Sequence, residues 1–308
     1  MNLKNLLLAA CICPAAAAIA APGQYFPDRQ LLTIKSTENG YPDENVSLTY
    51  VDNMLASVTD DNDSYTIDYS SVADGVVRAT ETNPYDQPKE YLLTLGDNGY
   101  AVKATVSQPG EQEEVFEFTY NAEGRLIKVV KTEGREVTTS EITYTDGSVT
   151  AVKIVADDPD DNLDATFTPS DIPNTGMLLS FDSLYGVDDM WDFVFAEYAG
   201  LLGRPAANLP ASAVIVYDGE RVTATLDWTI DADGYPTGFT PTSSEGDTEK
   251  YFFTWSDRSG IAETGISPES REITGIYAPD GRALDKLREG INIVRYSDGT
   301  TEKVMKRL

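Results

Sequence analysis

The sequence predicts an all-β protein, mainly antiparallel, in which a meander of hairpins curls into an open or half-closed barrel. Three observations predict this fold. Apolar and polar residues alternate over short runs, glycine-containing turns separate the runs, and the ends of the runs recur at a period near 24 residues. Alternation is typical of a strand with one buried face, and a repeat of one hairpin length indicates an array in which neighbours bury one another.

The first 20 residues have the features of an export signal that is removed. Lys4 gives a positive start, an apolar stretch follows, and Ala18-Ile19-Ala20 supplies a cleavage motif, so that the mature chain begins near Ala21. A membrane-spanning helix is disfavoured because the apolar run is shorter than the roughly 20 residues needed and Pro14 interrupts it. We therefore expect an exported protein that is periplasmic, secreted or on the cell surface.

Lipidation is the alternative for the same segment. Leu8-Ala9-Ala10-Cys11 resembles a lipobox, which would make Cys11 the anchor of an outer-membrane lipoprotein. Only five apolar residues precede Cys11, which favours ordinary cleavage.

Composition excludes several classes of function. The chain has no histidine, and its two cysteines, Cys11 and Cys13, both lie in the export segment. The mature chain therefore lacks Ser-His-Asp and Cys-His machinery, thiolate or imidazole metal sites, and disulfides. A net charge of −28 argues against nucleic-acid partners, which need clustered Lys and Arg.

Residues 21–45 form an N-terminal segment, and the meander domain is predicted to span 46–257. Its first strands place apolar residues two apart, as in Val46-Leu48-Tyr50 and Phe116-Phe118-Tyr120. Leu95, Tyr120 and Tyr144 each precede a turn and stand 25 and 24 residues apart. One strand, a tight turn, a second strand and a looser link account for this period.

An insertion separates the two halves of the meander. Trp191, Val194, Phe195 and Tyr198 recur at helical spacing before Gly203 and Pro205. The spacing predicts an amphipathic helix within 187–203 that covers the apolar concave face of the sheet. Alternating strands then resume and run to Trp255.

The composition changes after a linker at 258–268. Residues 21–268 carry 14 basic and 44 acidic groups, whereas residues 269–308 carry 8 basic and 7 acidic ones. Such an asymmetry indicates a separate module, here a small C-terminal β module of short strands.

Two resemblances add to this interpretation. Tyr120-Asn121-Ala122-Glu123-Gly124-Arg125-Leu126 resembles one unit of the tyrosine–aspartate repeats of Rhs-type proteins. Residues 45–257 are similar to an exported Bacteroidota family known only as domain of unknown function 4595. That similarity rests on Asp171-Ile172-Pro173-Asn174, on Leu201-Leu202-Gly203 with Asn208-Leu209-Pro210, and on 231–237. The family has no established activity, so the resemblance implies no catalytic residue.

The C-terminal segment 272–308 resembles the sorting tails of type IX secretion cargo. The similarity rests on Ile276-Tyr277-Ala278-Pro279-Asp280-Gly281-Arg282, on 290–295 and on the basic end at 303–306. It implies that the segment engages secretion machinery. A strand trio that docks on the main domain is the alternative.

Two candidate sites emerge from the residues. The acidic loop at 157–164 offers five carboxylates within eight residues, from Asp157, Asp158, Asp160, Asp161 and Asp164. Calcium binds such oxygen ligands, although a solvated loop without metal is the simpler interpretation. Tyr235, Tyr251 and Trp255 are the candidates for an aromatic platform that stacks on a glycan. The other tyrosines at strand ends are expected to be core residues with their hydroxyls at the rim.

These observations favour a non-enzymatic binding or interaction protein with no obligatory cofactor. Its partner would be a polysaccharide or another surface protein. A carboxylate-only glycoside hydrolase and a purely structural surface protein are the alternatives, and the first would need two isolated acids in a cleft.

Overall fold

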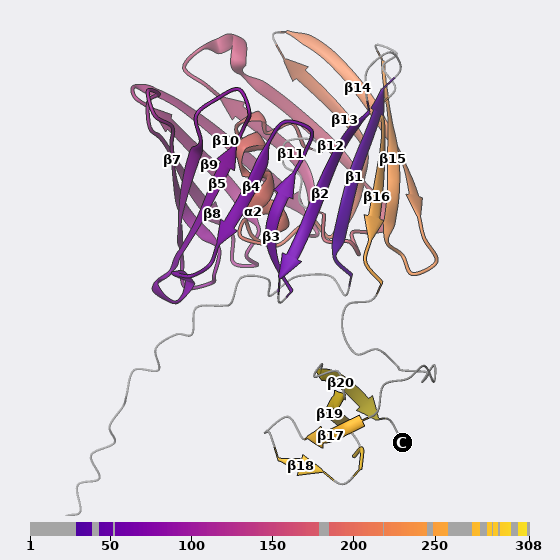
Figure 1. The fold of residues 1–308 in the computed structure, drawn as a ribbon. Coiled ribbons are helices and arrows are strands. Elements are labelled where there is room, and N and C mark those ends of the chain that lie inside the picture. Colours follow the sequence, from indigo (N-terminus) through magenta and orange to yellow (C-terminus); the bar gives the residue numbers. More distant parts are fainter. Residues whose placement is uncertain are drawn as a thin grey trace, which may run out of the picture.

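The computed structural model describes residues 29–38, 43–51, 53–178, 185–217, 219–244 and 249–257, and parts of 273–306. Sixteen strands form a closed antiparallel barrel in which each strand pairs with its neighbour in sequence (Figure 1). The strands are β1 (Leu31–Glu38), β2 (Glu44–Val51), β3 (Met54–Thr59), β4 (Ser64–Asp68), β5 (Val76–Thr82), β6 (Lys89–Leu95), β7 (Ala101–Ser107), β8 (Glu114–Tyr120), β9 (Leu126–Glu133), β10 (Glu136–Thr145), β11 (Ser148–Val155), β12 (Leu163–Pro173), β13 (Asn208–Tyr217), β14 (Glu220–Ile230), β15 (Pro236–Ser243) and β16 (Glu249–Trp255).

The all-β meander is as predicted, but the open or half-closed barrel is wrong. Strand β1 pairs with β16 from Leu31↔Trp255 to Glu38↔Glu249 and with β2 on its other side, so no strand edge remains in the ring. The closing strand lies in the segment 21–45, for which the sequence predicted no strand. Closure removes the unpaired edges that an open sheet would expose.

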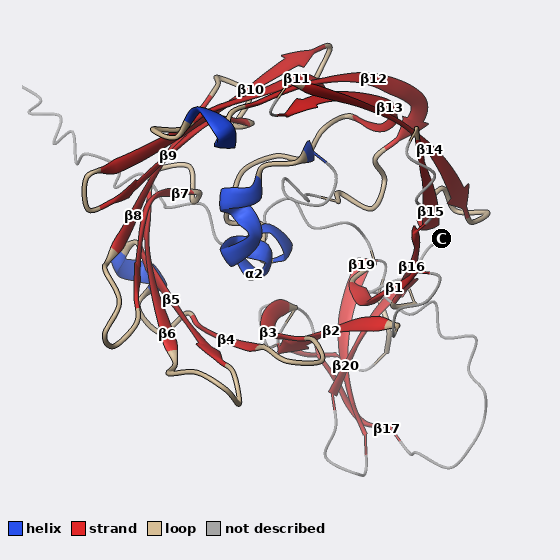
Figure 2. Ribbon diagram, turned by 90° about the horizontal axis from the view of Figure 1, so that it is seen from above, coloured by secondary structure: helices blue, strands red, loops and turns tan. Residues whose placement is uncertain are grey.

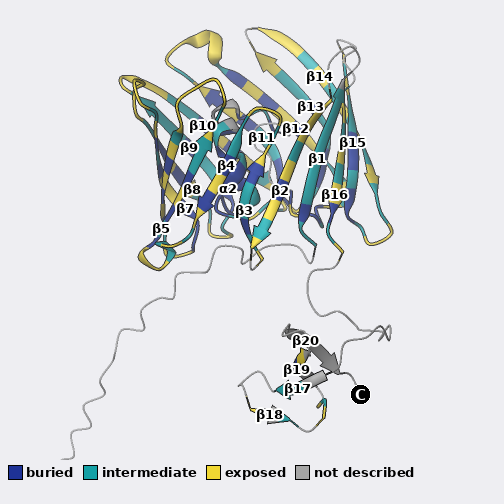
Figure 3. Ribbon diagram, viewed as in Figure 1, coloured by how far each residue is buried: buried dark blue, intermediate teal, exposed yellow. Residues whose placement is uncertain are grey.

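The apolar faces of the barrel strands lie on the inside. In β6, Tyr91, Leu93 and Leu95 are buried and the residues between them are exposed. In β14 the outward positions are all threonine or charged and exposed, while the inward ones are partly buried. Figure 3 shows this alternation of buried and exposed positions along the strands. The hydrophobic effect therefore places the core inside the ring.

The wall alone cannot fill so wide a ring, because barrels of 16 strands leave an open channel. Here the internal segment, which we define as the described residues within 174–207, enters the lumen (Figure 2). It contains a 3₁₀ helix at Asp188–Phe193 and the short helix α2 at Val194–Tyr198. Phe193 and Phe195 are fully buried in it.

The predicted helix over 187–203 is therefore wrong in length and in place. Only Val194–Tyr198 is α-helical, and it lies within the barrel instead of covering an open face. Apolar residues continue at Leu201 and Leu202, which are fully buried outside any helix. A segment surrounded by a barrel buries side chains in every direction, so its apolar spacing is not that of a one-sided helix.

The end of the internal segment is hydrogen bonded to successive hairpins of the wall. The amide of Ala101 donates to the carbonyl of Leu201, that of Arg204 to Gly124, and that of Ala207 to Gly147, at 2.8 Å each. The contacts advance by three residues in the segment and by 23 in the wall. Three extended residues span about 10 Å, which matches the width of two strands, or one hairpin.

A second sheet of four strands follows the barrel in the sequence. Its order is β18-β17-β19-β20, with β17 at Ile273–Tyr277, β18 at Ala283–Leu284, β19 at Gly290–Tyr296 and β20 at Thr301–Lys306. All of its pairs are antiparallel.

Cys11, Ala20 and Ala21 lie outside the described residues, as does the linker from residue 258 to 268. None of the helices in the described part of the chain combines the length and apolar character of a membrane span.

Candidate functional site

The two sides of the lumen differ in how well they are filled. Along β5 to β8 the inward side chains, such as Val77, Tyr91 and Phe116, are fully buried against the internal segment. Along β14, β16, β1 and β2 several apolar inward side chains remain partly exposed; these are Ile34, Val46, Leu226, Trp228, Ile230, Tyr251 and Phe253. The internal segment therefore fills one side of the lumen and leaves apolar wall uncovered on the other.

Aromatic packing explains why the filled side is dense. The Phe193 ring contacts Phe116 edge-on with centroids 4.7 Å apart, and Phe195 packs on Tyr91 at 5.1 Å and on Tyr65 at 5.5 Å. Edge-to-face and offset contacts of this kind add to the free energy gained by burial alone. This cluster fixes the internal segment against β4 to β8.

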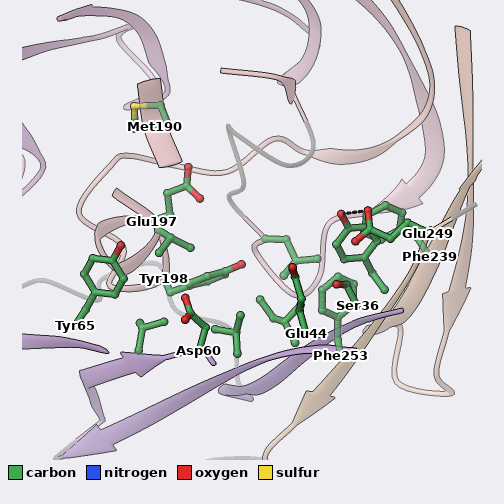
Figure 4. A pocket seen from close by; sticks show the side chains of 16 residues that line it. Ser36, Glu44, Asp60, Tyr65, Met190, Glu197, Tyr198, Phe239, Glu249 and Phe253 are labelled. Atoms are coloured by element: carbon green, nitrogen blue, oxygen red, sulfur yellow. Dashed lines mark hydrogen bonds between the residues drawn. The ribbon is translucent and has the colours of Figure 1, made fainter. Parts of the chain in front are cut away.

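A cavity of about 150 Å³ lies on the other side, between α2 and the strands around the closing seam. Its apolar lining comes from the wall, with Val46, Val58 and Phe253, and from the internal segment, with Met190 and Val194. Figure 4 shows these elements around one space. We call this space the lumen cavity.

Aromatic residues form one wall of the lumen cavity. Phe239 and Tyr251 stack with centroids 4.5 Å apart and planes 3° from parallel, and Phe253 lies 6.1 Å from Phe239 on the cavity side of the same pair of strands. Behind them Trp228 packs on Phe239 at 4.6 Å, and its indole nitrogen donates to the Pro210 carbonyl. The wall is therefore held rigidly from outside the cavity.

Four carboxylates also line the lumen cavity, each on a different element. Glu44 begins β2, Asp60 follows β3, Glu197 lies on α2 with 4% of its surface exposed, and Glu249 begins β16. Glu249 accepts a hydrogen bond of 2.7 Å from the Tyr251 hydroxyl. Asp60 uses one oxygen to accept from the amides of the following turn. None of the described residues that line the cavity is basic.

A separate polar network ties the internal segment to the filled side. Lys89 donates to Asp192 at 2.9 Å, and the Tyr91 hydroxyl donates to Glu81 at 2.5 Å. Burial raises the pKa of the Glu81 carboxyl, although the Tyr91 hydrogen bond and the Lys89 charge oppose the shift. Burial lowers the pKa of the Lys89 amine, but the hydrogen bond to Asp192 and the charges of Asp192, Glu81 and Glu114 together raise that pKa above its ordinary value. The network does not line the lumen cavity.

The candidate calcium ligands are not brought together. Among the described residues no group of three acidic side chains converges in a way that could hold a metal ion. Asp157 accepts from the Val137 amide and Asp158 accepts from the Asp160 amide, while Asp164 lies 3.9 Å from the Lys153 ammonium. Asp160 and Asp161 belong to an exposed 3₁₀ turn. These aspartates shape a surface loop.

The three candidate glycan-stacking residues have different surroundings. Tyr235 and Trp255 are 5% and 7% exposed and pack edge-on against each other with centroids 5.2 Å apart. The Trp255 indole donates to the Pro236 carbonyl, and Arg29 lies over the Tyr235 ring at 5.1 Å. Neither ring offers an open stacking face. Tyr251 alone lies at the lumen cavity.

The sequence interpretation missed Glu44, Asp60, Glu197 and the inward role of Glu249. A signal for two of them was present, since Glu44 and Glu249 share the inward phase of Val46 and Tyr251 in their strands. Asp60 and Glu197 carry no such signal, because a turn and a five-residue helix set their direction.

The comparisons with known proteins concern the fold. A comparison with curated proteins finds no match. A solved structure described as a porin-like protein from Bacteroides uniformis ATCC 8492 matches with a TM-score of 0.61 and 19% identity, over 75% of this chain and 98% of that one. At this identity the match shows a shared fold. Residues 28–238 match a family model for a domain of unknown function with porin-like fold, and the chain belongs to that family, DUF4595.

Proposed function

We propose that this protein is a non-enzymatic, exported binding protein whose barrel stands in water and takes a small amphipathic molecule into its lumen cavity. One observation carries the proposal: apolar side chains that face the inside of a closed barrel remain partly exposed to a cavity. Binding sites for small molecules are typically concave, mostly apolar and provided with a few polar groups. The lumen cavity has this composition.

The polarity of the outer face of the wall supports the proposal that the barrel stands in water. Outward positions of β8, β12 and β14 hold exposed threonine and charged side chains such as Glu117, Asp164 and Asp227. Transmembrane barrels have the opposite arrangement, with an apolar band outside and a polar lumen. Large apolar side chains that do face outward, such as Leu92, Val137 and Phe252, stand on separate strands. The export signal predicted for residues 1–20 supports a location outside the cytoplasm.

Methyl-resolved NMR tests the proposal at the level of single residues. The probe is 2-phenylethanol, which is neutral and amphipathic and carries the benzene ring that a cavity of about 150 Å³ can hold. We expect saturable shifts of the Ile34, Val46 and Val58 methyl resonances. The methyls of Val102 and Val137, on the outer face, should not move.

A matched pair of variants locates the binding. Val46→Trp places a large ring in the lumen cavity and should abolish the shifts, whereas Val137→Trp makes the same change on the outer face and should leave them intact. Shifts confined to the outer methyls, or equal binding by both variants, would contradict the proposal. A hydrolase would instead consume its ligand, so recovery of any bound glycan in shortened form would favour that alternative.

A further inference from the structure

The charged side chains that line the lumen cavity all have one sign. Glu44, Asp60, Glu197 and Glu249 reach it from four different elements, and no described lining residue is basic. We propose that the ligand is an organic cation, a primary or quaternary ammonium group carried on an aromatic or other compact apolar body. This inference rests on the proposed function and adds the charge of the ligand to it.

The aromatic rings that line the lumen cavity would also help to bind the ammonium group. Figure 4 shows the Tyr198 ring reaching into the cavity, with the carboxylates of Glu197 and Asp60 around the same space. Ammonium groups are attracted to the faces of aromatic rings, and more strongly where water is excluded. An anionic ligand in this space would lie near several carboxylates and would find no basic side chain among the described lining residues. Placing a second negative charge in a partly desolvated site costs free energy.

The spacing of the acids favours an organic cation over a metal ion. Calcium takes 6–8 oxygens at about 2.4 Å, which requires converging carboxylates. No group of three converges among the described residues. A charge spread over an ammonium group and its neighbouring carbons can instead interact with acids placed around a larger body. The net charge of −28 also raises the local concentration of cations near the molecule.

Three probes of nearly equal size separate charge from hydrophobicity: 2-phenylethylammonium, 2-phenylethanol and phenylacetate. Titrations followed by the Ile34 and Val46 methyl resonances should show the ammonium binding about tenfold or more tightly than the alcohol, with the anion weakest. Raising sodium chloride from about 0.02 M to about 0.5 M should weaken binding of the ammonium and leave that of the alcohol unchanged, since salt screens charge. Calcium chloride at equal ionic strength should displace no more ammonium than sodium chloride does.

Charge-removing variants that keep the shape of the side chain complete the test. The double variant Glu44→Gln/Glu249→Gln should reduce the preference for the ammonium several-fold without changing the affinity for the alcohol. Glutamine at 249 still offers an acceptor to the Tyr251 hydroxyl. The control Glu117→Gln/Asp227→Asn removes the same charge from the outer face, where both residues are exposed, and should leave the preference intact.

The outcomes separate the two proposals. Equal or tighter binding of the alcohol or the anion at the lumen methyls would overturn the inference of a cation and leave the lumen site standing. The same holds if the control variant loses the preference as fully as the lumen variant does, because the effect would then come from net charge. Failure of all three probes to move the lumen methyls would overturn the proposed function as well.

Discussion

Asn121 and Asp231 form the same turn at two places in the barrel. Each side chain accepts hydrogen bonds from the amides two and four residues later, at 2.9 to 3.0 Å. In each case the fourth residue of the turn is a glycine with positive φ, Gly124 or Gly234. Asparagine and aspartate favour such turns because the side chain replaces a backbone acceptor. Turn chemistry therefore explains two of the motifs on which the resemblances rested, residues 120–126 and 231–237.

Gly203 is a residue at which the internal segment approaches the wall closely. Its φ is 96°, and an added Cβ would lie 2.7 Å from the Gly124 carbonyl oxygen and 2.8 Å from the Tyr120 ring. We expect Gly203→Ala to lower the free energy of unfolding by about 2–4 kcal/mol, because a left-handed backbone and a steric clash add together. Urea denaturation followed by circular dichroism measures the change.

Gly219→Ala is the matched control for that variant. Gly219 also has a positive φ, of 75°, but an added Cβ would meet nothing within 4 Å. Only the strain of a positive φ applies at this position, so we expect Gly219→Ala to lower the free energy of unfolding by about 1 kcal/mol. Equal losses in the two variants would show that the close approach of Gly203 to the wall does not contribute.

At the scale of elements, the internal segment explains why the wall has a sequence period. The segment from Leu201 to Ala207 bonds to hairpins at Ala101, Gly124 and Gly147 in turn, so equal hairpin lengths keep these contacts in register. Asn174 fixes the other end, since its buried amide donates to the carbonyls of Leu178 and Ala206. The period of the wall was readable from the sequence, but the segment that contacts it was not, because residues 60 to 100 apart make these contacts.

The polar network at Lys89 makes a prediction about pH. Burial raises the pKa of Glu81 above its ordinary value, so the folded state holds that proton more tightly than the unfolded state does. Such a group stabilises the fold at low pH and loses this contribution as pH rises through the raised pKa. The contribution of Glu81 to the free energy of unfolding should therefore increase as pH is lowered from neutral toward the ordinary pKa of a glutamate carboxyl.

The variant Glu81→Gln isolates the contribution of Glu81 to the pH dependence of the free energy of unfolding. Glutamine keeps an acceptor for the Tyr91 hydroxyl and cannot ionise, so the slope of unfolding free energy against pH should become smaller. Glu117→Gln, an exposed carboxylate on the outer face, serves as the control and should keep the original slope. Identical slopes for the wild type and Glu81→Gln would contradict a destabilising charge at this position.

At the scale of the whole molecule, strand pairing was predictable and closure was not. Alternation and turns located strands such as β2, β8 and β16, since each depends on neighbouring residues alone, whereas β12 lies where no strand was predicted. Closure depends on β1, which pairs with β16 across more than 200 residues and whose Thr33, Lys35 and Ser36 weaken its apolar pattern. The lumen cavity depends in turn on closure, so most of its lining could not be assembled from the sequence.

The barrel has a porin-like fold, and outward positions on several of its strands hold threonine and charged side chains. The proposal that the barrel stands in water therefore makes a further prediction. Exposed threonine and charged side chains on the outer wall would have to enter hydrocarbon if the barrel were inserted in a bilayer, at a cost of about 2–4 kcal/mol for a lysine or arginine at the midplane. We expect the protein to stay monodisperse in buffer without detergent. It should remain in the supernatant when lipid vesicles are sedimented.

Co-sedimentation of the folded barrel with vesicles would contradict that expectation. A lipid anchor at Cys11 would give the same result, so the test compares the wild type with Cys11→Ser. Sedimentation lost in Cys11→Ser would assign the membrane contact to the anchor, while sedimentation kept in it would assign the contact to the barrel.

If the space between α2 and the seam of β16, β1 and β2 is a ligand site, a crystal structure of the protein grown with 2-phenylethylammonium will show the ligand there. We expect one ordered molecule in the lumen cavity, with its ring against Phe253 and Val46 and its ammonium toward the carboxylates of Glu44 and Glu249. A molecule ordered only on the outer wall, or a lumen filled by rearranged side chains under saturating ligand, would contradict it.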